Sequence, residues 1–385
     1  MPKPEYLAPG VYVGERPAQT KPIEGVPTST AGFIGLCQKG PYKTASPVTS
    51  LGEFERTYGK GRRPGFTWHA ARAFFEEGGR RLYVARARRW TIRDCRRALK
   101  CLEAAGEIST VAAPGSSVGG AGRFVAGLLI DHAERMRYRF AVLDSAPGQS
   151  VDGVRALRAG LDSSRAALYY PWVRVKDPAG TGELSLPPSG FVAGIYARGD
   201  AARGVAKAPA NEAVRLAVGL DHALTEAEGA ALNAGGINCI RSFGPGDVRV
   251  WGARTLSADA DWKYINVRRL SIFLEESIDN GTQWAVFEAN GEPLWANVRR
   301  AVQDFLINEW RSGSLQGTKP EEAFFVKCDR TTMTQADIDQ GRLICVIGAA
   351  VVKPAEFVIF RIGQWTADRP PSPPKRRRAA RRRPR

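Results

Sequence analysis

The sequence of 385 residues lacks several features on which common classes of protein depend. Its six cysteines include no Cys-x-x-Cys pair, and its three histidines (His69, His132 and His222) are far apart, so we expect neither a disulfide framework nor a metal site. No run approaches the ~20 apolar residues that cross a bilayer, and the N-terminus has no apolar signal core. We therefore expect a protein made in the cytoplasm, with reduced, buried cysteines and with export only by lysis or as part of a particle.

Motifs for catalysis and nucleotide binding are also missing. Ser189 stands in Pro-Ser-Gly and not in the Gly-x-Ser-x-Gly elbow of hydrolases, although Asp144, His132 and Ser189 are the residue types of a triad. Residues 115–122 are glycine-rich and lie between an expected strand and an expected helix, but they lack the Lys-Ser/Thr pair and the G-x-G-x-x-G pattern. The sequence predicts no catalytic, cofactor-binding or metal site, and an α/β hydrolase is kept as an alternative.

Acidic residues are absent from residues 369–385, which carry about half of the chain's formal charge of +17. This stretch follows a proline-rich linker, and we expect residues 366–385 to be a disordered basic tail. Arginines in such a tail bind polyanions by counterion release, while a solvated terminus that favours solubility is the competing interpretation. A basic nucleic-acid-binding protein is therefore a second alternative, with these candidate contacts: Lys375, Arg376, Arg377, Arg378, Arg381, Arg382 and Arg383.

The chain is long enough for two or three domains, and its 43% of apolar residues is ample for buried cores. Strands expected at 30–37 and 81–86 flank helices at 50–58 and 67–77, and Ser50 with Glu53 forms a capping box for the first helix. Strands and helices then alternate up to a buried strand at 166–175, which predicts a mostly parallel sheet covered by helices. Helices at 266–280 and 292–310 with strands at 323–328 and 343–352 predict a final α+β domain.

Two short β-prone runs have no partner beside them in the sequence. Val11, Tyr12 and Val13 follow a Pro-Gly turn, and a second run, after Pro354, contains Phe357, Val358, Ile359, Phe360 and Ile362. A lone strand is stable only when it joins a sheet. The partner is either an upstream strand of the same subunit or the sheet edge of another subunit.

These patterns predict a multidomain α/β and α+β protein with extended terminal arms. We expect an N-terminal arm (1–24), a small α/β module (25–89), a central α/β domain (90–255), a C-terminal α+β domain (256–353), a C-terminal arm strand (354–365) and the basic tail (366–385).

Segments spread from Tyr6 to Trp365 carry motifs of one family. They are Tyr-Leu-Ala-Pro-Gly-Val-Tyr-Val at 6–13 with 22–35 and 49–59, then 186–200 with 203–211, and finally 266–270, 324–329 and 354–360. In this order they resemble the contractile tail sheath proteins of phages and of phage-tail-like injection systems. The chain lacks the large outer insertions of some phage sheaths, which favours a tailocin or an extracellular injection system, and the resemblance does not explain the basic tail.

The resemblance implies a structural protein without enzyme activity. Subunits would stack as rings of a helical sheath around an inner tube and contract to drive that tube through a target envelope, with baseplate and terminator or cap proteins as further partners. Assembly would occur in the bacterial cytoplasm, and the mature protein would belong to a phage tail or contractile particle. The two arm runs would add strands to the tube-proximal domains of neighbouring subunits, on a receiving sheet that contains Phe324, Phe325, Val326, Cys328, Ile344, Val346 and Val351.

Overall fold

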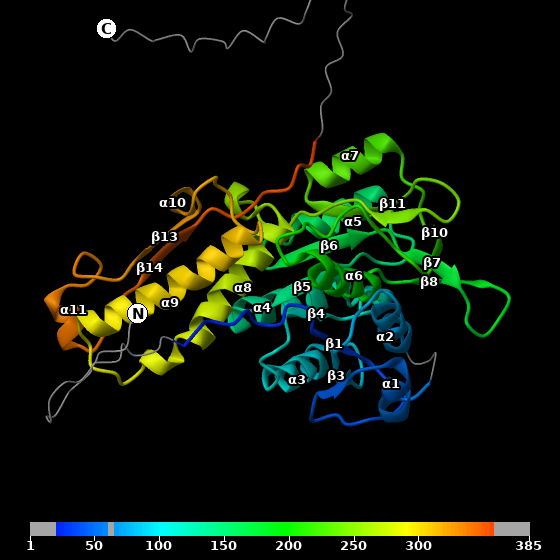
Figure 1. Cartoon of the computed structure of the whole chain (residues 1–385). Coiled ribbons are helices and arrows are strands. Elements are labelled where there is room, and N and C mark those ends of the chain that lie inside the picture. Colours follow the sequence, from blue (N-terminus) through cyan, green and yellow to red (C-terminus); the bar gives the residue numbers. More distant parts are fainter. Residues whose placement is uncertain (1–20, 61–64, 358–385) are drawn as a thin grey trace, which may run out of the picture. The chain divides into compact units, whose positions relative to one another are not determined.

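A nine-stranded sheet forms the centre of the computed structural model, which describes residues 21–60 and 65–357 (Figure 1). In spatial order its strands are β2 (Ser46–Val48), β3 (Leu82–Ala87), β1 (Ala31–Leu36), β4 (Thr110–Ala112), β5 (Phe140–Asp144), β6 (Ala166–Tyr170), β11 (Ile237–Ser242), β12 (Val248–Val250) and β9 (Glu212–Ala213). From β3 to β11 all neighbours run parallel. The remaining pairs are antiparallel, so the predicted mostly parallel sheet is confirmed.

Helices cover both faces of this sheet. Along β5 the side chains alternate, with Phe140 and Val142 in one hydrophobic core and Ala141 and Leu143 in the other. The first face carries α1 (Leu51–Tyr58), α2 (Thr67–Glu76) and α6 (Ser189–Arg203). The second carries α3 (Ile92–Glu103), α4 (Gly122–Met136), α5 (Val151–Ala159) and α7 (Glu226–Ala234).

Local sequence signals set several helix starts. The Ser50 hydroxyl accepts the N–H of Glu53 at 3.2 Å and begins α1 where the sequence predicts it. The Glu53 carboxylate, however, accepts from the N–H of Thr49 and not from that of Ser50. Thr91 and Ser150 cap α3 and α5 in the same way as Ser50 caps α1.

The expected single strand over residues 166–175 is wrong. It is broken at Pro171, which has no N–H to continue the ladder, into β6 of the large sheet and β7 (Val173–Lys176). Strand β7 lies in the middle of a separate antiparallel sheet between β10 (Ala217–Leu220) and β8 (Glu183–Leu186).

The N-terminal segment does not build a sheet of its own. Strands β1, β2 and β3, all from residues 25–89, lie in the same nine-stranded sheet as β4, β5 and β6. The predicted limit at residue 89 thus falls between β3 and α3 inside one continuous structure, and the domain limits remain predictions.

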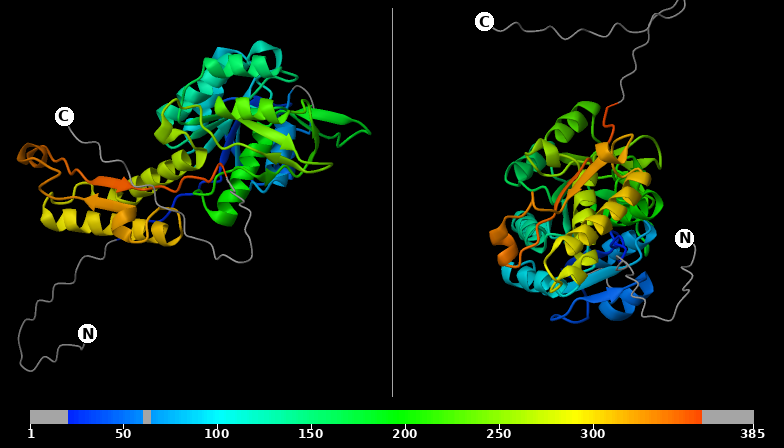
Figure 2. Two further views of the ribbon diagram at one scale, coloured as in Figure 1. Left: turned by 90° about the horizontal axis from the view of Figure 1, so that it is seen from above. Right: turned by 60° about the vertical axis from the view of Figure 1, so that its left-hand side comes forward.

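The C-terminal elements surround a third hydrophobic core. They are α8 (Ile265–Gly281), α9 (Glu292–Arg311), α10 (Pro320–Ala323), β13 (Phe324–Lys327), α11 (Gln335–Asp339) and β14 (Val346–Ala349). In Figures 1 and 2 these yellow and orange elements lie beside one end of the large sheet and not over its faces. Short 3₁₀ turns complete the described chain: η1 (Val118–Gly120), η2 (Ala260–Trp262) and η3 (Gln283–Ala285).

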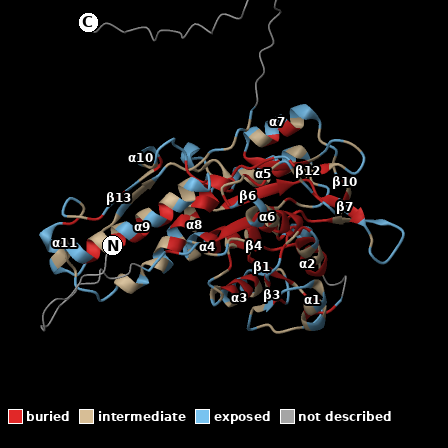
Figure 3. Ribbon diagram, in the orientation of Figure 1, coloured by how far each residue is buried: buried red, intermediate tan, exposed pale blue. Residues whose placement is uncertain are grey.

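Burial differs between the two regions. Figure 3 shows buried residues concentrated in the large sheet and its helices, whereas β13 and α11 are mostly intermediate or exposed. Across residues 21–60 and 65–357, none of the helices combines the length and the apolar character that a bilayer crossing requires.

Candidate inter-subunit surface of the C-terminal sheet

The C-terminal sheet has only two strands within the described part of the chain, and its two faces differ. Strands β13 and β14 pair antiparallel, with Phe325 opposite Gly348 and Val326 opposite Ile347. Val326 and Ile347 belong to the core formed with α9, so one face is covered by that helix. Alternation along the strands places Phe325 and Lys327 on the opposite face.

Hydrogen bonding shows which main-chain groups point away from the pair. The N–H of Ala350 donates to the carbonyl of Ala323 at 2.7 Å, so Ala350 faces the β13 side. Because successive residues of a strand point to opposite edges, Ile347 and Ala349 direct their N–H and C=O groups to the other edge of β14. Among the described residues no further strand pairs with that edge. It is therefore open for strand addition.

The uncovered face of this sheet is apolar. Phe325 is 50% exposed and Val346 is 42% exposed, and both lie on this face. The Phe325 ring lies directly over Gly348, where an added Cβ would be 2.2 Å from Cε1 of the ring. The ammonium of Lys327 lies 5.8 Å from the centre of the same ring. The absence of a side chain at residue 348 thus keeps this face flat.

The predicted receiving residues take different places in the structure. Phe324, Val326 and Cys328 lie on the α9 face, and Phe325 and Val346 are partly exposed. Ile344 precedes β14, and its carbonyl accepts the Thr332 hydroxyl at 2.8 Å; the strand expected over 343–352 covers only Val346–Ala349 in the structure. Val351 forms an isolated antiparallel bridge with Leu315.

The predicted arm and tail residues are almost all outside the described residues. This holds for Val11, Tyr12, Val13, Val358, Ile359, Phe360 and Ile362, and for the basic residues from Lys375 to Arg383. Phe357 is described, and its side chain is 71% exposed. Their roles remain predictions.

A buried ion pair fixes α8 to the large sheet. Arg269 of α8 donates to both carboxylate oxygens of Asp200 of α6, at 2.9 and 2.6 Å, and to the carbonyl of Thr28 at 3.1 Å. The Thr28 hydroxyl completes the cluster by donating to Asp200 at 2.7 Å. Although burial opposes it, the Asp200 carboxylate holds the pKa of Arg269 above its ordinary value. Sequence reasoning missed this cluster because its members are about 70 to 240 residues apart.

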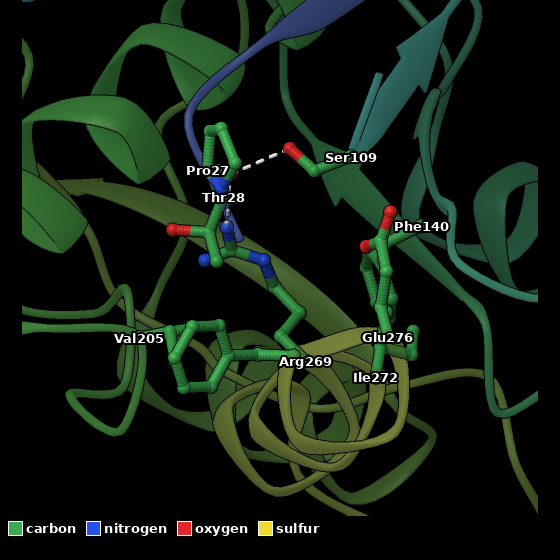
Figure 4. A pocket seen from close by; sticks show the side chains of 9 residues that line it. Pro27, Thr28, Ser109, Phe140, Val205, Arg269, Ile272 and Glu276 are labelled. Atoms are coloured by element: carbon green, nitrogen blue, oxygen red, sulfur yellow. Dashed lines mark hydrogen bonds between the residues drawn. The ribbon is translucent and has the colours of Figure 1, made fainter. Parts of the chain in front are cut away.

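A small pocket lies next to this ion pair (Figure 4). Figure 4 shows Arg269 and Ser109 both reaching Thr28, and the Ser109 hydroxyl donates to the Thr28 carbonyl at 2.6 Å. On the other side Glu276 of α8 lies beside Phe140, and burial raises the pKa of Glu276 to about 7, with Arg139 opposing and Asp279 adding to the rise. The polar groups of this pocket mainly hold α8 and the sheet together.

One amide joins the C-terminal sheet to the rest of the unit. The side-chain amide of Asn266, in the first turn of α8, donates to the carbonyl of Ala206 at 2.9 Å and to that of Val352 at 3.0 Å. The last residues after β14 are thereby tied to α8 and to the segment that follows α6.

Comparison with known proteins matches this arrangement to one family. The sequence model described as "Phage tail sheath protein central domain" matches residues 104–256, and that described as "Phage tail sheath C-terminal domain" matches residues 257–364. The chain resembles the contracted helical sheath of the anti-feeding prophage at 32% identity and a TM-score of 0.80, over 92% of this chain and 99% of that one. It belongs to the contractile tail sheath family.

Two further relatives support the same assignment of this sheath protein. A contracted sheath complex of the extracellular contractile injection system PVC is 30% identical, with a TM-score of 0.79 over 94% of this chain and 99% of that one. A prophage major tail sheath protein of Pseudomonas aeruginosa (strain UCBPP-PA14) is 27% identical over 266 residues, which cover 66% of this chain and 65% of that protein.

The sheath protein does not assemble the triad of the hydrolase alternative. The Ser189 hydroxyl and N–H both donate to Asp144, each at 2.7 Å, but Ser189 is fully buried at the start of α6. His132 lies in α4, on the opposite face of the sheet, where it contacts Arg139 at 2.7 Å. Burial, with Arg139, lowers the pKa of His132 to about 3, so this ring is a poor base at neutral pH.

An aromatic side chain packs against the first glycine of the glycine-rich loop of the sheath protein. In open α/β sheets, ligands bind outside the carboxyl ends of the strands where the strand order reverses, which here is between β1 and β4. Gly115 follows β4 with a φ of +80°, and an added Cβ would lie 2.4 Å from the Phe66 ring. Phe66 in turn packs edge-on against Trp172 at 5.2 Å. The Phe66 ring therefore occupies the space beside Gly115, at the start of this loop.

Proposed function

We propose that the chain is the repeating subunit of a helical contractile sheath around an inner tube, and that contraction drives this tube through a target envelope. One observation carries the proposal: nearly the whole chain matches subunits of two contracted sheaths at 30–32% identity. The baseplate, the tube protein and a terminator or cap protein are its proposed partners. The particle belongs to a phage tail or an extracellular contractile system, assembled in the bacterial cytoplasm.

The proposed joints between subunits are added strands. Residues 11–13 and 357–362 of neighbouring subunits extend the C-terminal sheet. In the assembled sheath, the domain that contains this sheet lies toward the tube. Supporting this, the outer edge of β14 is open among the described residues, and the exposed Phe325 provides an apolar surface next to it. Ladder hydrogen bonds suit such a joint because they hold two chains while the attached bodies rotate.

Contraction in this proposal needs no catalytic step. The extended sheath is metastable, and the free energy released when new contacts form between subunits drives the change. The buried Ser189 favours this interpretation over a hydrolase, and the missing Lys-Ser/Thr pair in residues 115–122 favours it over a nucleotide-driven motor.

Electron microscopy of the purified full-length protein, alone and with its tube protein, tests the proposal. We expect long tubular polymers that form without nucleic acid. Val358→Pro removes a main-chain donor from the proposed arm strand and should prevent normal sheaths, whereas Val358→Ala keeps the donor and should still assemble. Normal long sheaths from the proline variant would contradict the strand joint, and absence of any polymer in the wild type would contradict the sheath function itself.

A further inference from the structure

Two of the six cysteines face each other at the end of the C-terminal sheet. The β13–β14 register pairs Lys327 with Val346, so the next pair in the antiparallel sequence is Cys328 and Cys345. Both are free thiols, Cys328 buried and Cys345 partly exposed. Because 17 positions separate them in the sequence, no local motif pairs these two residues.

The position of this pair within the ladder suits a disulfide. The N–H of Ala350 donates to the carbonyl of Ala323, so these two opposite residues form a hydrogen-bonded pair. Hydrogen-bonded and non-hydrogen-bonded pairs alternate along an antiparallel ladder, so the pair of Cys328 and Cys345 is non-hydrogen-bonded. Cα atoms in such pairs are about 4.5 Å apart, inside the range of about 4.4–6.8 Å that disulfides span. Both side chains also belong to the core on the α9 face, so they point the same way.

The two thiols already interact. Their mutual influence raises the pKa of Cys328 and lowers that of Cys345, and Arg299 of α9 favours both thiolates. By contrast, burial raises the pKa of Cys37 to about 12, of Cys95 to about 11 and of Cys239 to about 12. Cys345 is thus the thiol best prepared to react as a thiolate, with Cys328 beside it.

We propose that Cys328 and Cys345 form a redox pair that closes to a disulfide and staples β13 to β14 when the protein meets a low-molecular-weight disulfide. The Cys345 thiolate attacks one sulfur of that disulfide and displaces one thiolate. The Cys328 thiol then loses its proton, attacks the Cys345 sulfur and displaces the second. Two electrons pass to the small disulfide, and the two protons of the protein thiols end on the two released small thiols.

The staple closes the loop of residues 329–344, which contains α11, and fixes the register of the sheet. It acts within one subunit and does not depend on assembly, so its test is independent of the sheath function. The reducing cytosol keeps both thiols reduced, so the disulfide forms only after the protein leaves the cell. The sheet then becomes more ordered.

The test equilibrates the full-length protein in mixtures of reduced and oxidised glutathione, blocks remaining thiols with an alkylating reagent, and maps unreduced peptides by mass spectrometry. We expect a peptide that links Cys328 to Cys345 and grows with the oxidised fraction, together with a rise in melting temperature. Cys101→Ser, the matched control at another partly exposed cysteine, should keep both effects. Cys328→Ser should lose the link and instead hold glutathione on Cys345.

Three outcomes overturn the proposal. These are full alkylation of Cys328 and Cys345 at every glutathione ratio, linkage of Cys345 to Cys101 or to a second subunit, and retention of the melting shift in Cys328→Ser. A link that forms without any melting shift contradicts the stapling role.

Discussion

Two of the three sheets, the nine-stranded sheet and the C-terminal sheet, differ in how fully one chain covers their faces and pairs their edges. The nine-stranded sheet has helices over both faces and several fully buried strands. The C-terminal sheet has two strands, one covered face and an open edge among the described residues. The first sheet therefore derives its stability from its own subunit, while the second leaves main-chain groups and apolar surface for another chain.

The largest expected effect tests the link between the two regions. Arg269→Met leaves Asp200 buried without its countercharge, and we expect a loss of about 3–5 kcal/mol in the free energy of unfolding, measured by urea denaturation. Arg330→Met is the matched control: its ion pair with Glu292 is largely exposed, and its loss should cost below about 1 kcal/mol. Equal losses in the two variants would remove the distinction between buried and exposed pairs.

The stability of the nine-stranded sheet should depend strongly on its hydrophobic core. Phe33 of β1 is fully buried and packs edge-on against Phe74 at 5.9 Å. Phe33→Ala should lower the free energy of unfolding by about 3–5 kcal/mol, because it removes a buried ring and leaves a cavity. Chemical denaturation measures this loss. A loss below about 1 kcal/mol in the free energy of unfolding would mean that the Phe33 ring is not tightly packed in this core.

Two sets of carboxyl groups should respond to pH with opposite sign. Burial raises the pKa of Asp144 to about 7, against the hydrogen bonds from Ser189, and that of Glu276 likewise to about 7. Around the C-terminal sheet, hydrogen bonds from threonine lower the pKa of three carboxylates, of which Glu322 is exposed and Asp329 and Asp337 are partly exposed. The raised pair stabilises the fold at low pH, and the lowered set stabilises it at higher pH.

The pH prediction concerns Asp144 and Glu276. Their contribution to stability is complete below their ordinary pKa values of 3.8 and 4.5 and is lost as pH rises toward about 7. Asp144→Asn and Glu276→Gln cannot ionise, so each should flatten the decline between about pH 4 and pH 7 by on the order of 1 kcal/mol, measured by denaturation across that range. Variants that decline as steeply as the wild type would show that neither group titrates there.

The C-terminal sheet should matter more for assembly than for the stability of the single subunit. Phe325→Ser should change the free energy of unfolding by less than about 1 kcal/mol because half of the ring is exposed, yet it should shorten or abolish sheaths in electron microscopy. Phe287→Ser removes a fully exposed aromatic ring away from the strands and is the control. If both variants assembled equally, the apolar face of β13 would have no part in the joint.

The smallest effect on folding is expected for the basic tail. Deleting residues 375–385 should leave the melting temperature unchanged but lower the retention of the protein on DNA at low salt, with the difference vanishing as salt rises. Retention that does not change on deletion would remove the polyanion role.

The sequence predicts elements well where local signals are strong. Ser50 marks the start of α1, and the apolar positions of residues 292–310 mark α9, because caps and helical periodicity are local properties. Helix α6 is not predicted, since residues 189–197 are buried on all sides and show no polar face. Gly190 and Gly194 pack against the backbone of α2, a contact that no local pattern reveals.

The candidate sites were harder to predict than the fold. Local patterns predict the strands β13 and β14, and the resemblance implies that they receive added strands, yet the open edge depends on the hydrogen bond from Ala350 to Ala323. The opposition of Cys328 and Cys345 depends on a register set across the loop of residues 329–344. The open edge and the opposition of the two cysteines both depend on how strands that are distant in the sequence pair with each other. Composition and periodicity do not encode that pairing.

The amide of Asn266 determines where a pulling force would enter the folded unit. A pull on the chain beyond Pro354 reaches Val352 first, whose carbonyl is held by Asn266 and whose N–H donates to the carbonyl of Ser314 at 3.3 Å. Because Asn266 also holds Ala206, tension is divided between α8 and the segment after α6 before it can peel β14 from β13. The weak two-stranded sheet is therefore mechanically shielded on the side where the chain leaves it.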